Sequence, residues 1–415
     1  PDPNAEKSAT EVATLNKAMQ EAMATLKNSK VGGKANGQYM YQLPWYMFVG
    51  APGTGKTTAL AESGLQFPAG KKAIGGVGGT RNCDWWFTDE AVLLDTAGRY
   101  TTQDSHSEVD KAAWNGFLDL LKKHRRRRPI NGVIIAVSAS DLMRMNESER
   151  SAQAASIRSR IKELHERLEI RFPIYVLVTK CDLLAGFIEY FDNLGKEERN
   201  QVWGVTFPTL ETDKIDETLQ SLPGELLTLE HQLQVRVLER VQQERDIKRR
   251  ALIYSFPQQF TVLTDGVTRF LNEVFSSNKY EENALLRGVY FSSGTQEGSP
   301  IDRVMGALAA SFGLDRQVLS PNANSGRSYF IHRLLKEVVF KEAELVGTNL
   351  RFEKQRRLLQ WGSAAALGVF FVVAGVLLTV SYVKNKNYIA DMETQVAAVD
   401  KMAKDLPAQH RAGGH

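Results

Sequence analysis

One glycine-rich stretch has the residue types and spacing of a loop that holds phosphate groups. Residues 50–57 read GAPGTGKT and follow an apolar run, WYMFV, that predicts a buried strand. Glycines let such a loop wrap closely around phosphates, and backbone N–H groups at the start of the next helix attract anions. We expect Lys56 to reach the β and γ phosphates and the Thr57 hydroxyl to bind Mg²⁺. The residues assigned to the nucleotide here are Gly50, Gly53, Gly55, Lys56, Thr57 and Thr58.

A carboxylate ends a second apolar run. Asp95 comes directly after AVLL and opens the tetrapeptide DTAG. An acidic side chain at the tip of a buried strand is what a second protein ligand to nucleotide-bound Mg²⁺ requires. The N–H group of Gly98 can then sense the terminal phosphate. We therefore predict that Thr57 and Asp95 hold the metal and that Gly98 contacts the nucleotide.

A third motif concerns the base. Thr179, Lys180 and Asp182 belong to TKCD, which closes the run IYVLV and resembles the [NT]KxD motif of GTP-binding proteins. A carboxylate accepts hydrogen bonds from both N1–H and the exocyclic amine of guanine, a donor pair that adenine lacks, and the stem of Lys180 covers the base. The alternative is that Asp182 caps the helix beginning at LLAGF. Residues 292–294, SSG, form a loose candidate for a loop that completes the base pocket.

Two residues are candidates for a role in hydrolysis. Thr80 is the best candidate for a switch threonine that coordinates Mg²⁺. Many GTPases place a glutamine after DTAG to orient the attacking water, but this chain has Arg99 there. Arginine stabilises developing negative charge on phosphate but offers no amide to position water. We therefore expect slow or partner-dependent hydrolysis, with Mg²⁺ and GTP or ATP as the cofactors.

The motifs require a parallel α/β sheet to position them. From Tyr41 onward, short apolar runs alternate with helical patterns, which is typical of such a sheet. Strands are expected at 45–49, 91–94, 132–137, 174–178 and 288–291, with 85–87 pairing with 91–94 as a hairpin. The expected fold class is an α/β P-loop NTPase of the small-GTPase type, with a mostly parallel sheet, a helical insertion and a C-terminal transmembrane helix.

Helical patterns fill the rest of the chain, and no strand is expected between Asp182 and Gly288. Helices are expected at 8–28, 223–250, 267–275, 301–312 and 329–346. The expected organisation is an N-terminal amphipathic helix and linker (1–38), an NTPase-like domain (39–295, with the insertion at about 184–285), a helical extension (296–361), a transmembrane helix (362–383) and the start of a periplasmic part (384–415).

Composition excludes several classes of protein. Hydrophobic residues make up 43% and charged residues 24%, which excludes a disordered chain or a disulfide scaffold. The net charge of +4, from 52 basic and 48 acidic residues, gives no case for nucleic-acid binding. Cys83 and Cys181 indicate a reducing compartment, and the histidines lack metal-ligand spacing. The basic run at 122–128, KKHRRRR, is interpreted as a solvated helix end or as a patch for a partner or anionic lipid.

One segment departs from the pattern of a soluble protein. Residues 362–383 read GSAAALGVFFVVAGVLLTVSYV without a charged side chain, long enough to span a bilayer as a helix. Basic residues are more frequent before this segment than after it, so the positive-inside bias places 1–361 in the cytoplasm. No signal peptide is recognisable at the N-terminus. The chain starts without Met, and we expect it to be a piece of a longer protein.

Five segments of the sequence, taken together, resemble one protein family. LPWYMFVGAPGTGKTTALAESGLQFP, GVGGTRNCDWWFTDEAVLLDTAGRY, RRPINGVIIAVSASDLM, TKCDLLAGFIEYF and RGVYFSSGTQEGSPIDR occur in this order, and the likeness covers roughly 39–383. They resemble the TssM family, also called IcmF, of inner-membrane core components of bacterial type VI secretion systems. The resemblance implies a cytoplasmic NTPase-like domain held by transmembrane helices, with a large periplasmic domain after the last one.

The family resemblance also implies partners and a role. It implies TssL and TssJ in a membrane complex, baseplate proteins on the cytoplasmic side, self-association in the assembly and contact with the lipid bilayer, but no nucleic acid. We expect a structural core subunit whose nucleotide-binding domain acts as an assembly or conformational switch. The alternative is an active NTPase whose hydrolysis energises assembly or export. The chain departs from the family outline in lacking an N-terminal pair of spans and nearly all of the periplasmic part.

Overall fold

The computed structural model describes residues 3–28, 39–68, 83–101, 107–208, 215–275, 284–294, 327–347 and 350–405. Thr80 and the helix expected at 301–312 lie outside these residues. The chain divides into two compact units, Pro1–Leu350 and Arg351–His415.

The first unit is built on a seven-stranded mixed sheet with the order β2-β3-β1-β4-β5-β7-β6. The strands are β1 (Trp45–Val49), β2 (Cys83–Phe87), β3 (Val92–Thr96), β4 (Gly132–Ser138), β5 (Pro173–Thr179), β6 (Gly204–Thr206) and β7 (Leu285–Phe291). Strands β3, β1, β4, β5 and β7 are parallel, whereas β2 and β6 pair antiparallel at the two edges. The predicted mostly parallel α/β sheet is therefore confirmed. The expectation that strands stop between Asp182 and Gly288 is wrong, because β6 lies there.

Alternate residues of each strand face two apolar layers. On one face, side chains such as Trp45, Met47 and Val49 pack with buried residues of α1 (Pro3–Asn28), α4 (Ser107–His124), α6 (Glu147–Leu168) and α10 (Ile247–Phe275). On the other face, Tyr46 and Phe48 pack against α3 (Lys56–Ala61) and the segment 327–347. The continuous burial along β1 to β5 follows from this three-layer arrangement, since both faces of the sheet are covered.

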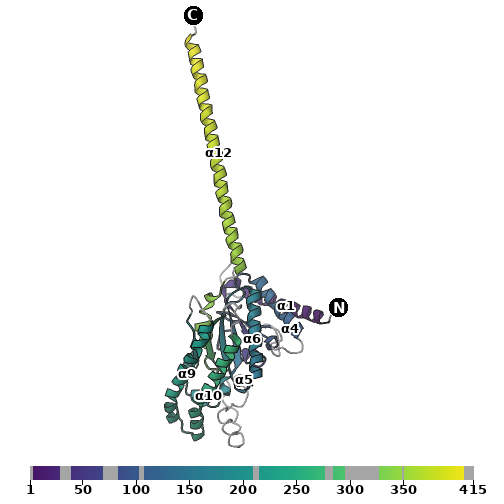
Figure 1. The fold of residues 1–415 in the computed structure, drawn as a ribbon, viewed down its shortest axis with the longest axis vertical. Helices are drawn as coiled ribbons and strands as arrows, with labels where there is room; N and C mark the ends of the chain where they lie inside the picture. Colours follow the sequence, from purple (N-terminus) through teal and green to yellow (C-terminus); the bar gives the residue numbers. More distant parts are fainter. Residues whose placement is uncertain are drawn as a thin grey trace. The chain divides into compact units, whose positions relative to one another are not determined.

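Helix α1 is an integral part of the first face. Leu15, Met19 and Ala22 are buried, at the spacing expected for the amphipathic helix predicted over 8–28. Helix α1 lies beside α4 (Figure 1), and the approach is close at Gly116, where an added Cβ would lie 2.6 Å from a methyl group of Val12. A larger residue at position 116 would therefore require the Val12 side chain or the helix to shift.

The long helix expected at 223–250 is instead two antiparallel helices. Helices α9 (Ile215–Gln243) and α10 lie side by side (Figure 1). The chain turns at Glu244–Asp246, because the Asp246 carboxylate caps α10 by accepting hydrogen bonds from the N–H groups of Lys248 and Arg249. Leu226 and Leu233 of α9 are buried, whereas Leu238 is 66% exposed. Helix α10 extends through the predicted 267–275.

Short helical elements complete the first unit. They are α2 (Tyr39–Gln42), η1 (Gly98–Thr101), α5 (Ala139–Arg144), η2 (Cys181–Leu183), α7 (Phe187–Phe191) and α8 (Lys196–Arg199). The helix expected at 329–346 is not continuous: Tyr329 forms a β-bridge with Ser293, and the π-helix η3 (Leu334–Val339) and the 3-10 helix η4 (Ala343–Leu345) follow. Residues 327–347, assigned by sequence to an extension, pack on the sheet.

The second unit contains helix α12 (Leu350–Asp405) apart from its first residue. Within Ala365–Lys404, the most apolar stretch of 18 residues has a mean hydropathy of 2.3, and none of its residues is buried. Within the described residues, it is the one helix long and apolar enough to cross a membrane. The helix continues beyond Val383, where the predicted span ends.

Candidate functional site

The glycine-rich loop joins the carboxyl end of β1 to the start of α3. Gly53 and Gly55 have φ angles of +74° and +80°, a conformation that side chains disfavour. A Cβ at Gly50 would lie 2.4 Å from the carbonyl oxygen of Ala136 on β4. The glycines therefore let the backbone turn sharply beside the sheet, leaving N–H groups at the helix N-terminus, where anions are favoured.

The Lys56 side chain lies back over this loop. Its Nζ donates hydrogen bonds to the carbonyl oxygens of Gly50, at 2.8 Å, and Ala51, at 3.2 Å. Lys56 is buried, and burial lowers the pKa of its ammonium group, while nearby Asp95 opposes that change. The two carbonyl dipoles offset the positive charge of Lys56 only in part, and a bound phosphate would offset it more fully.

Two side-chain oxygens suited to binding Mg²⁺ lie close together beside the glycine-rich loop. Thr57 Oγ1 donates a 2.5 Å hydrogen bond to Oδ2 of Asp95, which is fully buried. Mg²⁺ prefers hard oxygen ligands and usually takes one or two from the protein, with the rest from water and phosphate. The pair fits that donor set. Among the described residues, no group of three or more His, Cys, Asp or Glu side chains could hold a metal ion.

The DTAG segment lies directly against the glycine-rich loop. A Cβ on Gly98 would lie 2.4 Å from both the N and Cα atoms of Pro52. Backbone atoms of the two loops are thus in direct contact. This contact needs glycine at position 98, for a reason that the four-letter motif does not reveal.

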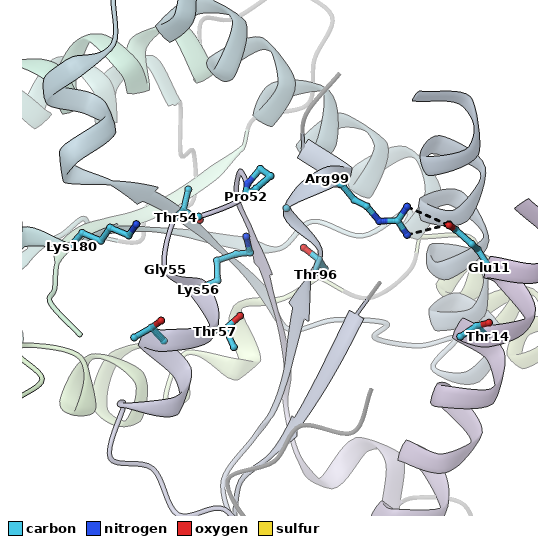
Figure 2. Close-up of a pocket in the computed structure, with 13 residues that line it drawn as sticks. Glu11, Thr14, Pro52, Thr54, Gly55, Lys56, Thr57, Thr96, Arg99 and Lys180 are labelled. Carbon is cyan, nitrogen blue, oxygen red and sulfur yellow. Dashed lines mark hydrogen bonds and ion pairs between the residues drawn. The ribbon is translucent and has the colours of Figure 1, made fainter. Parts of the chain in front are cut away.

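Arg99, the next residue, points toward helix α1 rather than into the loop (Figure 2). Its guanidinium contacts the Glu11 carboxylate at 3.2 and 3.3 Å and also pairs with Asp110 of α4. Sequence reasoning missed Glu11 and Thr14 as site residues, because α1 is far from the loop in the chain and carries no motif. Both line the same cavity as the glycine-rich loop.

The TKCD motif lies at the carboxyl end of β5, next to the loop. The hydroxyl of Thr179 donates to the carbonyl oxygen of Thr54, and Lys180 has a left-handed conformation with φ of +59°. The helix-cap alternative for Asp182 is wrong, because Asp182 lies inside η2, whose N-cap is Lys180. The carboxylate instead accepts a 2.6 Å hydrogen bond from Ser293 Oγ.

Burial controls the protonation of Asp182. It raises the pKa of this carboxyl to about 6, and the hydrogen bond from Ser293 works in the opposite direction. The loose candidate loop at 292–294 is therefore beside the motif, and a Cβ on Gly294 would lie 3.3 Å from the methyl group of Thr58. The loop after β7 and the start of α3 approach each other here.

The loops enclose a cavity of about 930 Å³ at the carboxyl edge of the sheet (Figure 2). It is lined by Glu11, Thr14, Pro52, Gly53, Thr54, Gly55, Lys56, Thr57, Thr58, Thr96, Gly98, Arg99 and Lys180. Its volume is in the range of ligand sites. Strand order reverses at β1, between β3 and β4, which is where ligands bind in sheets of this kind.

Fold and site together define an α/β protein with a glycine-rich loop that borders a cavity at the carboxyl edge of a mostly parallel sheet. The model of the IcmF-related N-terminal domain matches residues 107–367. The chain belongs to this family. Type VI secretion system component TssM1 of Pseudomonas aeruginosa is 53% identical over 414 residues, which cover 99% of this chain and 38% of that protein. The chain thus spans well under half the length of this relative.

Solved structures with a limited likeness include two that bind GTP or GDP. The signal recognition particle receptor SRb-GTP/SRX complex from Chaetomium thermophilum is 19% identical, with a TM-score of 0.24, and covers 35% of this chain and 75% of that one. A GTP-binding protein from Sulfolobus solfataricus in complex with GDP is 13% identical, with a TM-score of 0.21, and covers 44% and 51%.

Proposed function

We propose that this chain is the nucleotide-binding, membrane-anchored part of a structural subunit of a type VI secretion system. The observation that carries the nucleotide proposal is the meeting of Lys56, Thr57 and Asp95 beneath one glycine-rich loop. Lys56 supplies a positive charge for the phosphates of a nucleoside triphosphate, and Thr57 and Asp95 supply two oxygen ligands for Mg²⁺. When bound, Mg²⁺ would neutralise charge on the β and γ phosphates.

The fold is proposed to be a P-loop NTPase of the small-GTPase type. Support comes from the order of the motifs along the sheet, with the glycine-rich loop after β1, DTAG at the carboxyl end of β3 and TKCD at the carboxyl end of β5. All three therefore open on the carboxyl edge, where a single nucleotide can contact them together.

Guanine is the base that this site favours. Asp182 lies beside Lys180, which lines the cavity, and its carboxylate is held by Ser293. Such a carboxylate can accept both donors on the Watson–Crick edge of guanine, whereas adenine offers no matching donor pair. GTP is accordingly preferred to ATP in this proposal.

A conformational switch is favoured over a fast enzyme. Arg99 replaces the water-orienting glutamine, and its guanidinium is engaged by Glu11 and Asp110. Hydrolysis would therefore need a further group, supplied by rearrangement or by a partner. An NTPase that energises assembly or export is the second candidate, and intact Lys56, Thr57 and Asp95 favour it over a site without chemistry.

The proposed location is the bacterial inner membrane. Helix α12 would cross it, with residues 1–361 in the cytoplasm and the C-terminal side in the periplasm. Proposed partners are TssL and TssJ in the membrane complex, baseplate proteins in the cytoplasm and further copies of the subunit.

Titration of the full chain in detergent with fluorescent GTP and ATP analogues and Mg²⁺ tests the nucleotide proposal. We expect GTP to bind, Lys56→Ala to abolish binding of both nucleotides and Asp182→Asn to remove the preference for GTP. ATP binding indifferent to Asp182→Asn would contradict the guanine assignment. Absence of binding in the native chain would contradict the nucleotide site. Normal secretion by Lys56→Ala would exclude the enzyme alternative.

A further inference from the structure

The amino edge of the sheet, opposite the cavity, carries a group of basic residues. We call Lys123, Arg126, Arg127 and Arg171 the basic edge. They come from the end of α4, the loop before β4 and the residues before β5, and all four are exposed. Strands β4 and β5 are neighbours, with Val133 opposite Ile174, so the segments that precede them begin at the same edge.

None of these four positively charged side chains has a carboxylate partner among the residues that the structure describes. Neighbouring charges behave differently, since Lys122 pairs with Glu169, Arg128 with Glu344 and Arg167 with Asp119. Glu166 is the remaining exposed acid on the adjoining end of α6. The edge therefore keeps a net positive charge that faces solvent.

The run 122–128 does more than end a helix. Arg125 is 1% exposed and its guanidinium lies 4.4 Å from the ring centroid of Trp45 and 5.2 Å from that of Tyr41. The N–H group of Arg127 donates to the Tyr41 hydroxyl. These contacts fix the backbone between α4 and β4, so that Arg126 and Arg127 project from a rigid loop.

The chain leaves the first unit at this same edge. Asn131 Nδ2 donates to the carbonyl oxygen of Ala343, and Arg128 pairs with Glu344. The N–H group of Gly347 donates a 2.7 Å hydrogen bond to the carbonyl oxygen of Arg171. The last anchored residue before α12 is therefore attached to a member of the basic edge.

Chain length keeps this edge near the proposed membrane. Helix α12 starts at Leu350, and the rise from there to Trp361, at the start of the apolar segment, is about 17 Å. Four further basic residues, Arg351, Lys354, Arg356 and Arg357, lie in that interval of the sequence. Cationic clusters on the cytoplasmic side next to a spanning helix are attracted to anionic lipid.

We propose that the basic edge is a docking surface for the anionic headgroups of the cytoplasmic leaflet. Docking turns the amino edge of the sheet toward the bilayer and leaves the nucleotide cavity, at the opposite edge, open to the cytoplasm. The inference rests on the proposed function only in assuming that α12 spans a membrane. It does not require that the cavity binds nucleotide.

Energy transfer in nanodiscs tests this surface on the full chain. A donor dye is placed on Glu166→Cys, and the acceptor is a headgroup-labelled lipid in discs of phosphatidylcholine alone or with phosphatidylglycerol. Cys83 and Cys181 are buried and do not compete for the label. We expect higher transfer with phosphatidylglycerol, and this difference should disappear in high salt because screening weakens the attraction.

The matched variants are R126E/R127E and R245E/K248E. The first reverses two charges of the basic edge and should lower the ratio of docked to undocked protein at least about tenfold. The second reverses two exposed charges at the turn between α9 and α10 and should leave transfer unchanged. Unaltered elution and melting of R126E/R127E would show that the variant is folded.

Three results would overturn the proposal. Equal transfer in both lipids for the native chain, or a lipid difference that persists in R126E/R127E, would show that the edge does not bind headgroups. If the chain did not insert into nanodiscs, α12 would not span a membrane, and the inference depends on that span. Each leaves the nucleotide titration unaffected, so the two proposals fail separately.

Discussion

Arg99 and Glu11 form a two-point contact, with Nη1 of Arg99 3.3 Å from Oε1 of Glu11 and Nη2 3.2 Å from Oε2 (Figure 2). The arginine follows Gly98, which touches the glycine-rich loop, and the glutamate belongs to the N-terminal helix α1. A continuous set of contacts therefore joins the glycine-rich loop to α1. If a terminal phosphate attracted Arg99, Glu11 would lose its partner.

Glu11→Gln is expected to loosen α1 without unfolding the protein. Both side chains are about a third exposed, so the loss of stability should stay below about 1 kcal/mol. Hydrogen exchange of α1 amides should accelerate. Glu90→Gln, which removes a comparable exposed pair with Lys336, is the control and should leave α1 exchange unchanged. Unaltered exchange in Glu11→Gln would show that apolar packing alone holds α1.

Asp182→Asn is expected to stabilise the protein while removing its preference for guanine. The carboxyl has a pKa of about 6 in the fold against an ordinary value of 3.8, so burial of its charge costs up to about 3 kcal/mol at pH 7. Asparagine keeps the acceptor for Ser293 without the charge. Denaturant unfolding at pH 7 measures the gain, which should shrink at pH 4, where the native carboxyl is protonated. A loss of stability at pH 7 would contradict this account.

GTP affinity should fall as pH decreases through about 6. Protonation of Asp182 removes the carboxylate that accepts both guanine donors, and its raised pKa places that change within reach of ordinary buffers. Titrations with a GTP analogue at pH 5 and pH 7.5 measure the difference. Asp182→Asn supplies the comparison, since its affinity should not follow this pH dependence. A native affinity that is constant over the range would remove Asp182 from the base pocket.

Gly98→Ala is expected to weaken nucleotide binding and to destabilise the fold. Its methyl group would lie 2.4 Å from backbone atoms of Pro52, so one of the two loops must move, at a cost of about 1–3 kcal/mol. Gly224→Ala in α9 is the matched control, since an added Cβ meets nothing within 4 Å there. This control should gain about 0.5–1 kcal/mol from helix propensity. Thermal melting distinguishes the two, and equal melting temperatures would contradict the steric argument.

Glu342→Ala is expected to detach the segment 327–347 from the sheet. The carboxylate accepts hydrogen bonds from Arg287 Nε at 3.0 Å, Arg287 Nη2 at 2.6 Å and the Tyr175 hydroxyl at 2.7 Å. Removing it leaves the Arg287 charge buried, at a cost of about 3–5 kcal/mol. Chemical denaturation measures the loss, and Glu344→Ala, which removes a carboxylate that is 81% exposed, should cost less than about 1 kcal/mol. Similar losses in both variants would show that Arg287 finds other partners.

The sequence by itself determined the features that depend on local chain chemistry. The bounds of β1, the carboxylate at the end of β3, the glycine-rich loop and the long apolar helix could all be predicted. Burial in a parallel sheet, a sharp glycine-rich turn and a long apolar segment each leave a short continuous pattern in the sequence. Membership in the IcmF-related family follows from the same strings of residues.

Tertiary structure decided the relations between distant segments. Residues Glu11 and Thr14 enter the cavity because the apolar stripe of α1 packs on α4, not because of any motif. The break at 244–246 and the strand β6 were missed because a capping aspartate and a three-residue edge strand carry weak local signals. The joining of Gly347 to Arg171 likewise depends on a backbone hydrogen bond, which any residue types could form. Spacing along a chain cannot encode such contacts, since packing free energy depends on surfaces that meet only after folding.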